Sequence, residues 1–305
     1  MKNNYLLCIV GPTAIGKTTL SIKLAKAFDT EILSADSRQF YKEMNIGTAA
    51  PSKKEMAAAP HHFIHHKSIE EEYSVGDFEK EALAKTEELF KKHNLLILVG
   101  GSGLYVKSLL EGLDDFPEIS PEIRIKLNEQ FAEFGFEALK EQLKSLDPEY
   151  FKKMDSDNPH RVIRALEICL GTGKAFSSFL DRPKTQRPFK SISIGLTAPR
   201  EEIYERVNHR VDIMMDEGLL EEARDLYSKH HLNALNTVGY KELFAYFEGK
   251  LNLEEAVAEI KKNTRRFAKR QLTWFRKDKN IHWFDYKTPA EEILAFIKAE
   301  ISKEK

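Results

Sequence analysis

The sequence has few of the features that mark secreted, membrane-spanning or metal-stabilised proteins. Its 305 residues include only two cysteines, Cys8 and Cys169. Both lie in apolar stretches, so we interpret them as reduced core residues rather than as a disulfide or metal ligands. No apolar run approaches the length of a membrane span, and a strand pattern begins too early to leave room for a signal peptide. These absences predict a cytoplasmic protein that does not enter a membrane.

An excess of charge is also absent. The formal net charge is −1, and 42% hydrophobic with 31% charged residues is typical of a globular protein. Any contact with nucleic acid must therefore come from a local basic patch. The length is sufficient for one large domain or two.

The most informative motif that is present is a phosphate-binding loop of the form G-x-x-x-x-G-K-[ST]. It follows the apolar run 5–10 and precedes a helical pattern marked by Leu20, Leu24 and Phe28, which is the strand–loop–helix context of this motif. Backbone N–H groups and the helix N-terminus attract phosphate, Lys17 adds a mobile cation, and Thr18 can bind Mg²⁺. The residues predicted to bind a di- or triphosphate are Gly11, Pro12, Thr13, Ala14, Ile15, Gly16, Lys17 and Thr18.

An acidic residue is missing where many P-loop enzymes have one. The apolar run 95–99 continues into Gly100-Gly101-Ser102-Gly103 without a carboxylate, although kinases and hydrolases of this class commonly carry a Mg²⁺ ligand there. The nearest candidate is Asp36, which follows the predicted strand 31–35. From its position alone, Asp36 fits a base that abstracts a proton, a metal ligand, or a cap of the next segment.

Strand and helix patterns alternate along most of the chain, as in a parallel sheet covered by helices. We predict strands at 5–10, 31–35, 94–99, 191–196 and 281–284. Helices are predicted at 17–28, 75–92, 103–111, 199–216, 217–229, 238–248, 253–277 and from 289, while 37–73 is predicted to be mainly loop. The expected fold class is α/β, with a P-loop parallel-sheet core and helices on both faces.

The strand pattern disappears between residues 113 and 188. Helix starts with proline at the first helical position occur at Ser120-Pro121, Asp147-Pro148 and Asn158-Pro159. We therefore predict that residues 113–188 form an inserted all-α domain. Residues 1–112 and 189–305 then form the α/β core with its C-terminal helices.

A basic segment ends the longest of the predicted C-terminal helices. Residues 261–277 contain eight Lys or Arg side chains and no acidic residue, with Trp274 and Phe275 interleaved. Basic and aromatic side chains together suit a nucleic-acid backbone with exposed bases. We interpret the segment as a nucleic-acid contact, and a solvated surface helix is the alternative.

Together these motifs resemble those of the tRNA dimethylallyltransferases, also called tRNA isopentenyltransferases. The resemblance extends from the phosphate loop to the region of residue 286, and the order and separation of the segments also match. The matching segments are 11–18, Ser34-Ala35-Asp36-Ser37, 41–49, 98–105, 158–167, 238–242 and 269–276. Such a series is far more specific than a phosphate loop alone.

The resemblance implies transfer of a dimethylallyl group from dimethylallyl diphosphate to N6 of the adenosine on the 3′ side of the anticodon in tRNA. The phosphate loop would then hold the diphosphate leaving group. The implied cofactor is Mg²⁺, bound at Thr18, the implied partner is the anticodon stem-loop of tRNA, and we expect a monomer. The implied catalytic residues are Lys17, Asp36 as general base, Ser102 near the diphosphate, and Arg210 as a diphosphate ligand.

The resemblance also implies that the predicted insertion 113–188 is a tRNA-binding domain, and it implies a set of tRNA contacts in both predicted domains. They are Asp36, Ser37, Arg38, Gln39, Arg124, His160, Arg161, Val162, Ile163, Arg164, Thr237, Gly239, Tyr240, Lys241, Lys269, Arg270, Gln271, Thr273, Trp274 and Arg276.

Simpler roles exist for several of these residues. Ser102 suits a helix cap, and a lone arginine such as Arg210 is commonly an exposed helix residue. A histidine cluster invites a metal site, but no third ligand type is spaced to complete one, so we predict none there. The cluster consists of His61, His62, His65 and His66.

Other functions are also compatible with parts of the pattern. An adenylate isopentenyltransferase would use a free nucleotide as acceptor, yet a mononucleotide needs neither the insertion nor the basic helix. A P-loop kinase conflicts with the missing acidic residue after the run 95–99. A non-catalytic RNA-binding protein would leave the combination of Asp36, Ser102 and Arg210 unexplained.

Overall fold

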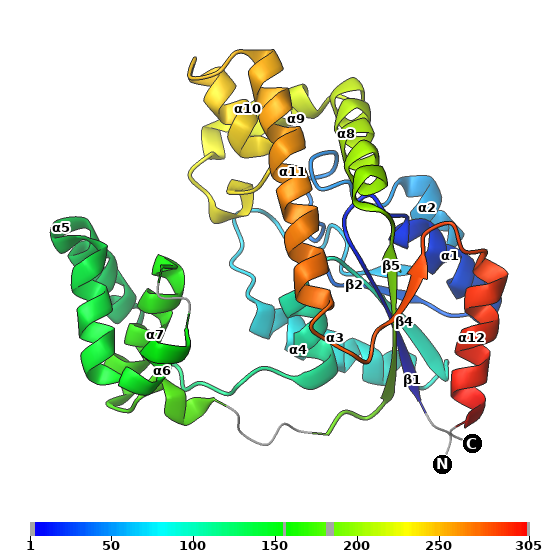
Figure 1. Ribbon diagram of the computed structural model, residues 1–305, viewed down its shortest axis with the longest axis horizontal. Coiled ribbons are helices and arrows are strands. Elements are labelled where there is room, and N and C mark those ends of the chain that lie inside the picture. Colours follow the sequence, from blue (N-terminus) through cyan, green and yellow to red (C-terminus); the bar gives the residue numbers. More distant parts are fainter. Residues whose placement is uncertain (1–3, 155–156, 181–185, 304–305) are drawn as a thin grey trace. The chain divides into compact units, whose positions relative to one another are not determined.

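The computed structural model describes residues 4–154, 157–180 and 186–303, and the chain divides into two compact units (Figure 1). The larger unit comprises residues 1–111 and 186–305, and the smaller unit comprises residues 112–185. The stretches 155–156 and 181–185 of the predicted insertion lie outside the described residues. In the described part of the chain, no helix is both long and apolar enough to cross a membrane.

Within the described residues, the larger unit is built on six parallel strands. Their spatial order is β3 (His61–His62), β2 (Ile32–Ser34), β4 (Leu95–Val99), β1 (Tyr5–Val10), β5 (Lys190–Thr197) and β6 (His282–Asp285). The central strands β1 and β4 are buried along their whole length. Such continuous burial is typical of a parallel sheet with helices on both faces.

Helices connect the strands of the larger unit and extend beyond the sheet. They are α1 (Lys17–Phe28), α2 (Lys53–Ala58), α3 (Val75–Leu89), α4 (Gly103–Glu111), α8 (Arg200–Asp216), α9 (Leu219–Leu226), α10 (Tyr240–Phe247), α11 (Leu253–Phe275) and α12 (Ala290–Lys303). Side chains of β1 alternate between two layers. Leu7 and Ile9 pack with α1, α8 and α12, whereas Cys8 and Val10 pack with α3, α4 and the end of α11.

The predicted α/β class, strands and long helices are confirmed, with differences of a few residues at their ends. The segment 37–73 is the exception, because it contains α2 and β3. Six-residue α2 depends on a capping box between Ser52 and Glu55, and two-residue β3 depends on pairing with β2 at the edge of the sheet. Neither is long enough to show a hydrophobic period. The predicted helix 217–229 is also shorter, because Gly218, with φ of 102°, precedes α9 and the chain continues after Leu226 as a 3₁₀ turn.

The smaller unit is helical in its described part. It contains α5 (Pro121–Leu146), α6 (Pro148–Lys153), α7 (Pro159–Thr172) and a 3₁₀ turn at Phe176–Phe179. Each α-helix begins with proline behind a capping side chain, supplied by Ser120, Asp147 and Asn158, as the sequence predicts. Asp147 is buried and also accepts hydrogen bonds from the backbone and hydroxyl of Ser177, which ties the 3₁₀ turn to α6.

Candidate active site

The phosphate loop connects the carboxyl end of β1 to the first turn of α1. Gly11, Ala14 and Gly16 all have positive φ, and these turns direct the backbone around the start of the helix. A Cβ atom at Gly11 would lie 2.6 Å from the carbonyl oxygen of Leu196 in β5, so only glycine allows this approach. The local geometry is that of a cradle of backbone N–H groups at a helix N-terminus, which favours an anion.

Lys17 extends back over the loop that precedes it. Its Nζ donates hydrogen bonds to the carbonyl oxygens of Gly11 (3.0 Å) and Pro12 (2.8 Å). Burial, with a smaller contribution from Arg210, lowers the pKa of Lys17 to about 7, while Asp36 opposes this shift. An anion in the loop would favour the charged form. The protonation of Lys17 therefore depends on what the loop binds.

Asp36 and Ser102 follow the carboxyl ends of the neighbouring strands β2 and β4. Oδ1 of Asp36 accepts hydrogen bonds from the N–H groups of Arg38 (2.9 Å) and Gln39 (3.3 Å), so it caps this turn. Oγ of Ser102 accepts from the N–H of Ser37 (3.0 Å) and donates to its Oγ (3.2 Å). Among the described residues, Oδ2 of Asp36 has no hydrogen-bond partner. One carboxylate oxygen thus fixes the turn while the other is available for chemistry.

Helix α8 brings two arginines to the same region. Arg210 donates to the carbonyl oxygen of Ala49 (3.2 Å), and burial lowers its pKa while Asp36 raises it. Arg210 is partly buried, so the interpretation as an ordinary exposed helix residue is wrong. Arg206 donates through Nε to the carbonyl oxygen of Ala14 in the phosphate loop (2.9 Å). Arg206 is not among the site residues predicted from the sequence, although its i, i+4 spacing from Arg210 puts both on one helix face.

The donor groups at the phosphate loop fit a Mg²⁺ ion that arrives with a phosphate ligand. No group of three His, Cys, Asp or Glu side chains within the described residues could hold a metal ion by itself. Mg²⁺ in such sites takes one or two protein oxygens, with substrate phosphates and water completing the shell. The hydroxyl of Thr18, in the first turn of α1, is an oxygen of this kind.

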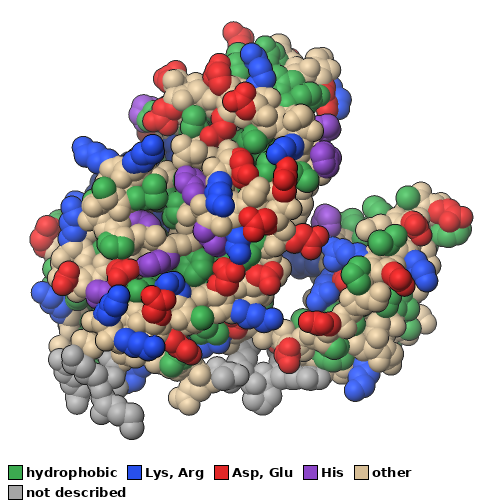
Figure 2. Space-filling view, turned by 180° about the vertical axis from the view of Figure 1, so that it is seen from behind, with side chains coloured by type: hydrophobic (Ala, Val, Ile, Leu, Met, Phe, Trp, Pro, Cys, Tyr) green, Lys and Arg blue, Asp and Glu red, His purple; other side chains and the backbone are tan. Residues whose placement is uncertain are grey.

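The solvent side of α11 carries a groove with a cavity volume of about 390 Å³. We call it the basic groove, and its lining residues are Arg266, Lys269, Arg270, Thr273, Trp274 and Lys277. The face shown in Figure 2 is mixed, with basic and acidic side chains next to one another. The basic groove is therefore a local feature of a nearly neutral protein.

Other basic residues of the segment 261–277 are engaged within the protein. The pairs are Lys261 with Asp212, Lys262 with Glu259, and Arg265 with Asn208. Lys262, one turn before Arg266, does not line the basic groove, and Glu259 lies one turn before it on the same helix. The absence of acids inside 261–277 does not exclude acids just outside it.

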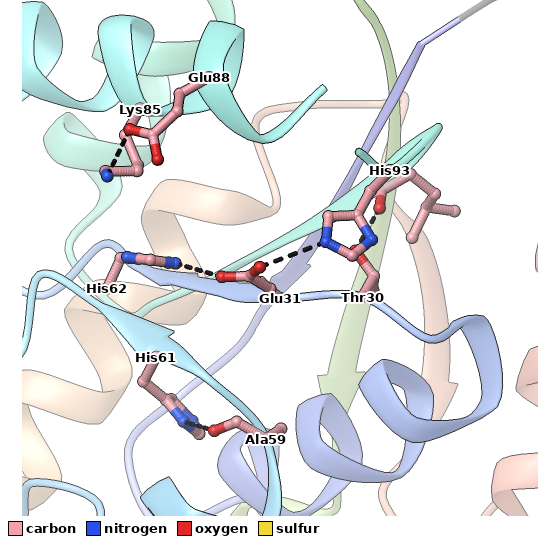
Figure 3. A network of polar contacts seen from close by, with 9 residues as sticks. Thr30, Glu31, Ala59, His61, His62, Lys85, Glu88 and His93 are labelled. Atoms are coloured by element: carbon pink, nitrogen blue, oxygen red, sulfur yellow. Dashed lines mark hydrogen bonds and ion pairs between the residues drawn. The ribbon is translucent and has the colours of Figure 1, made fainter. Parts of the chain in front are cut away.

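Two histidines of the cluster, His61 and His62, have structural partners (Figure 3). Glu31 lies between His62 and His93, with Oε2 2.7 Å from Nε2 of His62 and Oε1 3.2 Å from Nε2 of His93. Nδ1 of His61 is 2.8 Å from the carbonyl oxygen of Ala59. These contacts join the start of β2 to β3 and to the segment that leads into β4. They secure the amino ends of β2 and β4 and the edge strand β3, away from the phosphate loop.

Comparison with known proteins assigns the chain to a family. The sequence profile described as IPP transferase matches residues 39–278. A tRNA dimethylallyltransferase of Christiangramia forsetii is 62% identical over 300 residues, covering 98% of this chain and 99% of the relative. The chain belongs to the IPP transferase family. A second relative of the same name, from Flavobacterium johnsoniae, is 58% identical over 299 residues, covering 96% of this chain and 97% of the relative.

Solved structures of the family share the fold. The full-length tRNA isopentenylpyrophosphate transferase of Bacillus halodurans matches with a TM-score of 0.74 and 38% identity, covering 98% of this chain and 97% of that chain. A eukaryotic dimethylallyltransferase, studied acting on tRNA, matches with a TM-score of 0.84 and 26% identity, covering 98% of this chain and 80% of that chain. The resemblance inferred from the sequence motifs is confirmed.

For this IPP transferase, four of the implied tRNA contacts have buried side chains, namely Val162, Ile163, Tyr240 and Gln271. In this structure these four side chains make contacts within the protein. The first two pack into the core of the smaller unit because they lie on the inner face of α7. Tyr240 donates to a carboxylate oxygen of Glu222 (2.7 Å), and Gln271 is hydrogen-bonded inside the larger unit.

Most of the other implied contacts have side chains at the surface. Those of His160, Arg161, Lys241, Lys269, Arg270, Thr273, Trp274 and Arg276 are exposed, while those of Ser37, Arg38, Gln39 and Thr237 are partly buried, and Gly239 is buried. Arg124 and Arg164 both donate to Oε2 of the buried Glu167, each at 3.1 Å. Glu167 thereby holds two guanidinium groups together at the surface of the smaller unit.

Proposed function

We propose that this IPP transferase moves a dimethylallyl group from dimethylallyl diphosphate to N6 of the adenosine on the 3′ side of the anticodon in tRNA and releases diphosphate. One observation carries the proposal. Lys17 follows β1 and Asp36 follows β2, on the two sides of β4, and Asp36 lies close enough to Lys17 and to Arg210 of α8 to favour their charged forms. A cationic phosphate cradle thus lies beside a carboxylate with an available oxygen.

The cationic groups act on the leaving group. The bond between the allylic carbon and the diphosphate oxygen breaks, and negative charge develops on the diphosphate. Backbone N–H groups of residues 11–18, Lys17 and Arg210 are arranged to neutralise that charge. Mg²⁺, held by Thr18 together with the phosphate oxygens, would supply further positive charge when bound. Arg206 keeps the loop in shape through its hydrogen bond to Ala14.

Asp36 acts on the acceptor. N6 of adenine is a weak nucleophile because its lone pair is delocalised into the ring. As the bond from N6 to the allylic carbon forms, Oδ2 of Asp36 takes the N6 proton, so that the product amine is neutral. Ser102 holds the Asp36 turn in place through Ser37. The target adenine must leave its stack to enter the site, and this costs least in a single-stranded loop.

The RNA-binding role rests on two surfaces, one on each unit of the chain. On the larger unit, the basic groove combines four cationic side chains with the half-exposed indole of Trp274. On the smaller unit, Arg124 and Arg164 form a pair of exposed guanidinium groups beside His160 and Arg161. Such groups suit phosphates and unstacked bases.

The test is an acceptor assay. The protein is incubated with labelled dimethylallyl diphosphate and Mg²⁺, and with unmodified tRNA, AMP or ATP in parallel. The proposal predicts label on N6 of tRNA adenosine and one diphosphate released per transfer. Label on AMP in place of tRNA would identify an adenylate isopentenyltransferase, and phosphate transfer from ATP would identify a kinase.

A further inference from the structure

Gln271 is a buried amide at a point where three segments of the larger unit meet. It lies on α11 with 6% of its surface exposed. Its Oε1 accepts a hydrogen bond from the N–H of Thr13 in the phosphate loop (2.8 Å), and its Nε2 donates to the carbonyl oxygen of Gly101 after β4 (3.0 Å). One side chain therefore connects a helix to two loops that are 258 and 170 residues away in sequence.

The loop after β4 is shaped to receive α11. A Cβ atom at Gly101 would lie 2.3 Å from Nε2 of Gln271, and one at Gly103 would lie 2.2 Å from the indole of Trp274. Both distances are far below a van der Waals contact, which is about 3.5–4.0 Å between carbon atoms. Only glycine lets the loop approach α11 this closely, so the contact is specific in shape as well as in hydrogen bonding.

The two sides of α11 differ in character. On the inner side, Ala268 and Phe275, one turn before and one turn after Gln271, are buried with it. The basic groove lies on the solvent side. Trp274 contributes to both sides, because it lies against the loop at Gly103 and also lines the groove with 40% of its surface exposed. The helix that carries the proposed RNA groove is also the helix that holds the phosphate loop.

We propose that Gln271 is a positioning residue that sets the alignment of the diphosphate cradle with the Asp36 turn. The inference rests on the proposed function. Oε1 of Gln271 fixes the N–H of Thr13, so the loop N–H groups that follow stay turned toward the diphosphate. Its amide nitrogen fixes Gly101, and the next residue, Ser102, holds Ser37 and thereby Asp36. The loop that binds the donor and the turn that faces the acceptor are thus held by one buried side chain.

The test compares Gln271→Met and Gln271→Glu in transfer to an anticodon stem-loop. Met keeps the length but removes both hydrogen bonds, so we expect kcat to fall roughly 10- to 100-fold, the usual effect of small misalignment of reacting groups. KM for the stem-loop should change less than about twofold, because charge-assisted phosphate contacts in the basic groove remain. A KM that rises with no change in kcat would overturn the proposal.

The transfer rate of Gln271→Glu should depend on pH in a way that would not be seen if Gln271 only stabilised the fold. An ionised Glu at 271 keeps the acceptor for Thr13 but turns a second oxygen toward the carbonyl of Gly101. A protonated Glu restores the donor, and burial favours protonation. Its rate relative to wild type should therefore rise as the pH falls from about 8 to about 6, a range open to a buried carboxyl. The same ratio for Gln271→Met should be independent of pH.

Gln186→Met is the matched control, because Gln186 is an exposed glutamine of the same unit with no place in the site. It should transfer at the wild-type rate. A wild-type kcat for Gln271→Met, or a pH-independent ratio for Gln271→Glu, overturns the positioning role. If wild-type protein itself transfers nothing, the proposed function fails instead. Binding of inorganic diphosphate then decides the inference. Weaker binding by Gln271→Met than by wild type supports the role of Gln271 in holding the phosphate loop, and equal binding contradicts it.

Discussion

The two ends of the parallel sheet carry polar residues that are satisfied in different ways. At the amino ends, Glu31 is matched by His62 and His93 (Figure 3). At the carboxyl ends, the described hydrogen bonds of Lys17 and Arg210 go to backbone carbonyl groups rather than to a carboxylate. Charges that are matched to one another hold the fold together, whereas charges matched only by backbone groups are available to a ligand.

The comparison also explains why the conspicuous histidines are not the site. Four histidines within six positions attract attention in the sequence. The functional candidates are instead separate residues, such as Asp36 and Arg210, which only the fold brings together. Changes at the carboxyl ends should alter chemistry, and changes at the amino ends should alter stability.

The largest effect is expected for Asp36→Asn. The variant keeps an Oδ1 acceptor for the turn but has no carboxylate to take the N6 proton, so transfer should slow roughly 10²- to 10⁴-fold. Single-turnover transfer to an anticodon stem-loop measures this, with stem-loop affinity as the control that should not change. Recovery of the rate when Mg²⁺ is raised would show that Asp36 is a metal ligand instead.

Lys17→Ala should weaken binding of inorganic diphosphate, by about 10-fold or more for a lost charge-assisted hydrogen bond. Because the pKa of free-state Lys17 is lowered to about 7, an anion that favours the charged form must bind with proton uptake. Affinity should therefore fall as the pH rises above 7, relative to Lys17→Arg, which stays charged. Calorimetry on both variants and wild type measures this. Parallel pH curves for wild type and Lys17→Arg would contradict it.

The basic groove should control the salt dependence of RNA binding. Replacing Arg266, Lys269 and Arg270 with Ala should reduce the slope of log affinity against log salt by about 2, if each contacts one phosphate of a single strand. The double change Lys261→Ala and Lys262→Ala is the matched control, because those two side chains are paired within the protein. An equal loss of slope in the control would mean that the groove is only a solvated face.

The smallest effect on catalysis is expected for Glu31→Gln. Burial raises the pKa of Glu31, but hydrogen bonds from His62 and His93 outweigh burial, so the net pKa is lowered. The carboxylate therefore adds stability above its unfolded pKa, and this contribution is lost as the pH falls through the folded pKa. The variant should lose about 1–2 kcal/mol of unfolding free energy at neutral pH. Denaturant unfolding at two pH values measures this, and transfer per folded molecule should stay at the wild-type level.

The sequence predicts the features that depend on local pattern. The phosphate loop is a contiguous motif, and the runs 5–10 and 95–99 are continuous apolar strands, so both the loop and the sheet follow from neighbouring residues. Strand order then places Asp36 beside Ser102, because β2 and β4 are adjacent and parallel. The capping prolines of the smaller unit are predicted for the same local reason.

Features that depend on contacts between distant segments are not predicted. The resemblance marks Gln271 only as a tRNA contact, and packing of α11 on two distant loops is what buries it. Arg206 reaches the phosphate loop from 192 residues away. The two-residue strand β3 exists only because β2 offers an edge for pairing. In each case the deciding energy comes from a partner that the local sequence does not reveal.

The proposed acceptor is N6 of an RNA adenosine, and one measurement tests this most directly. Labelled dimethylallyl diphosphate is given to two anticodon stem-loops, one with adenosine on the 3′ side of the anticodon and one with purine riboside, which lacks the exocyclic amine. Both should bind with equal affinity, and only the adenosine stem-loop should take up label and release diphosphate. Label on the purine stem-loop, or transfer to AMP at the rate seen with the adenosine stem-loop, would contradict the account.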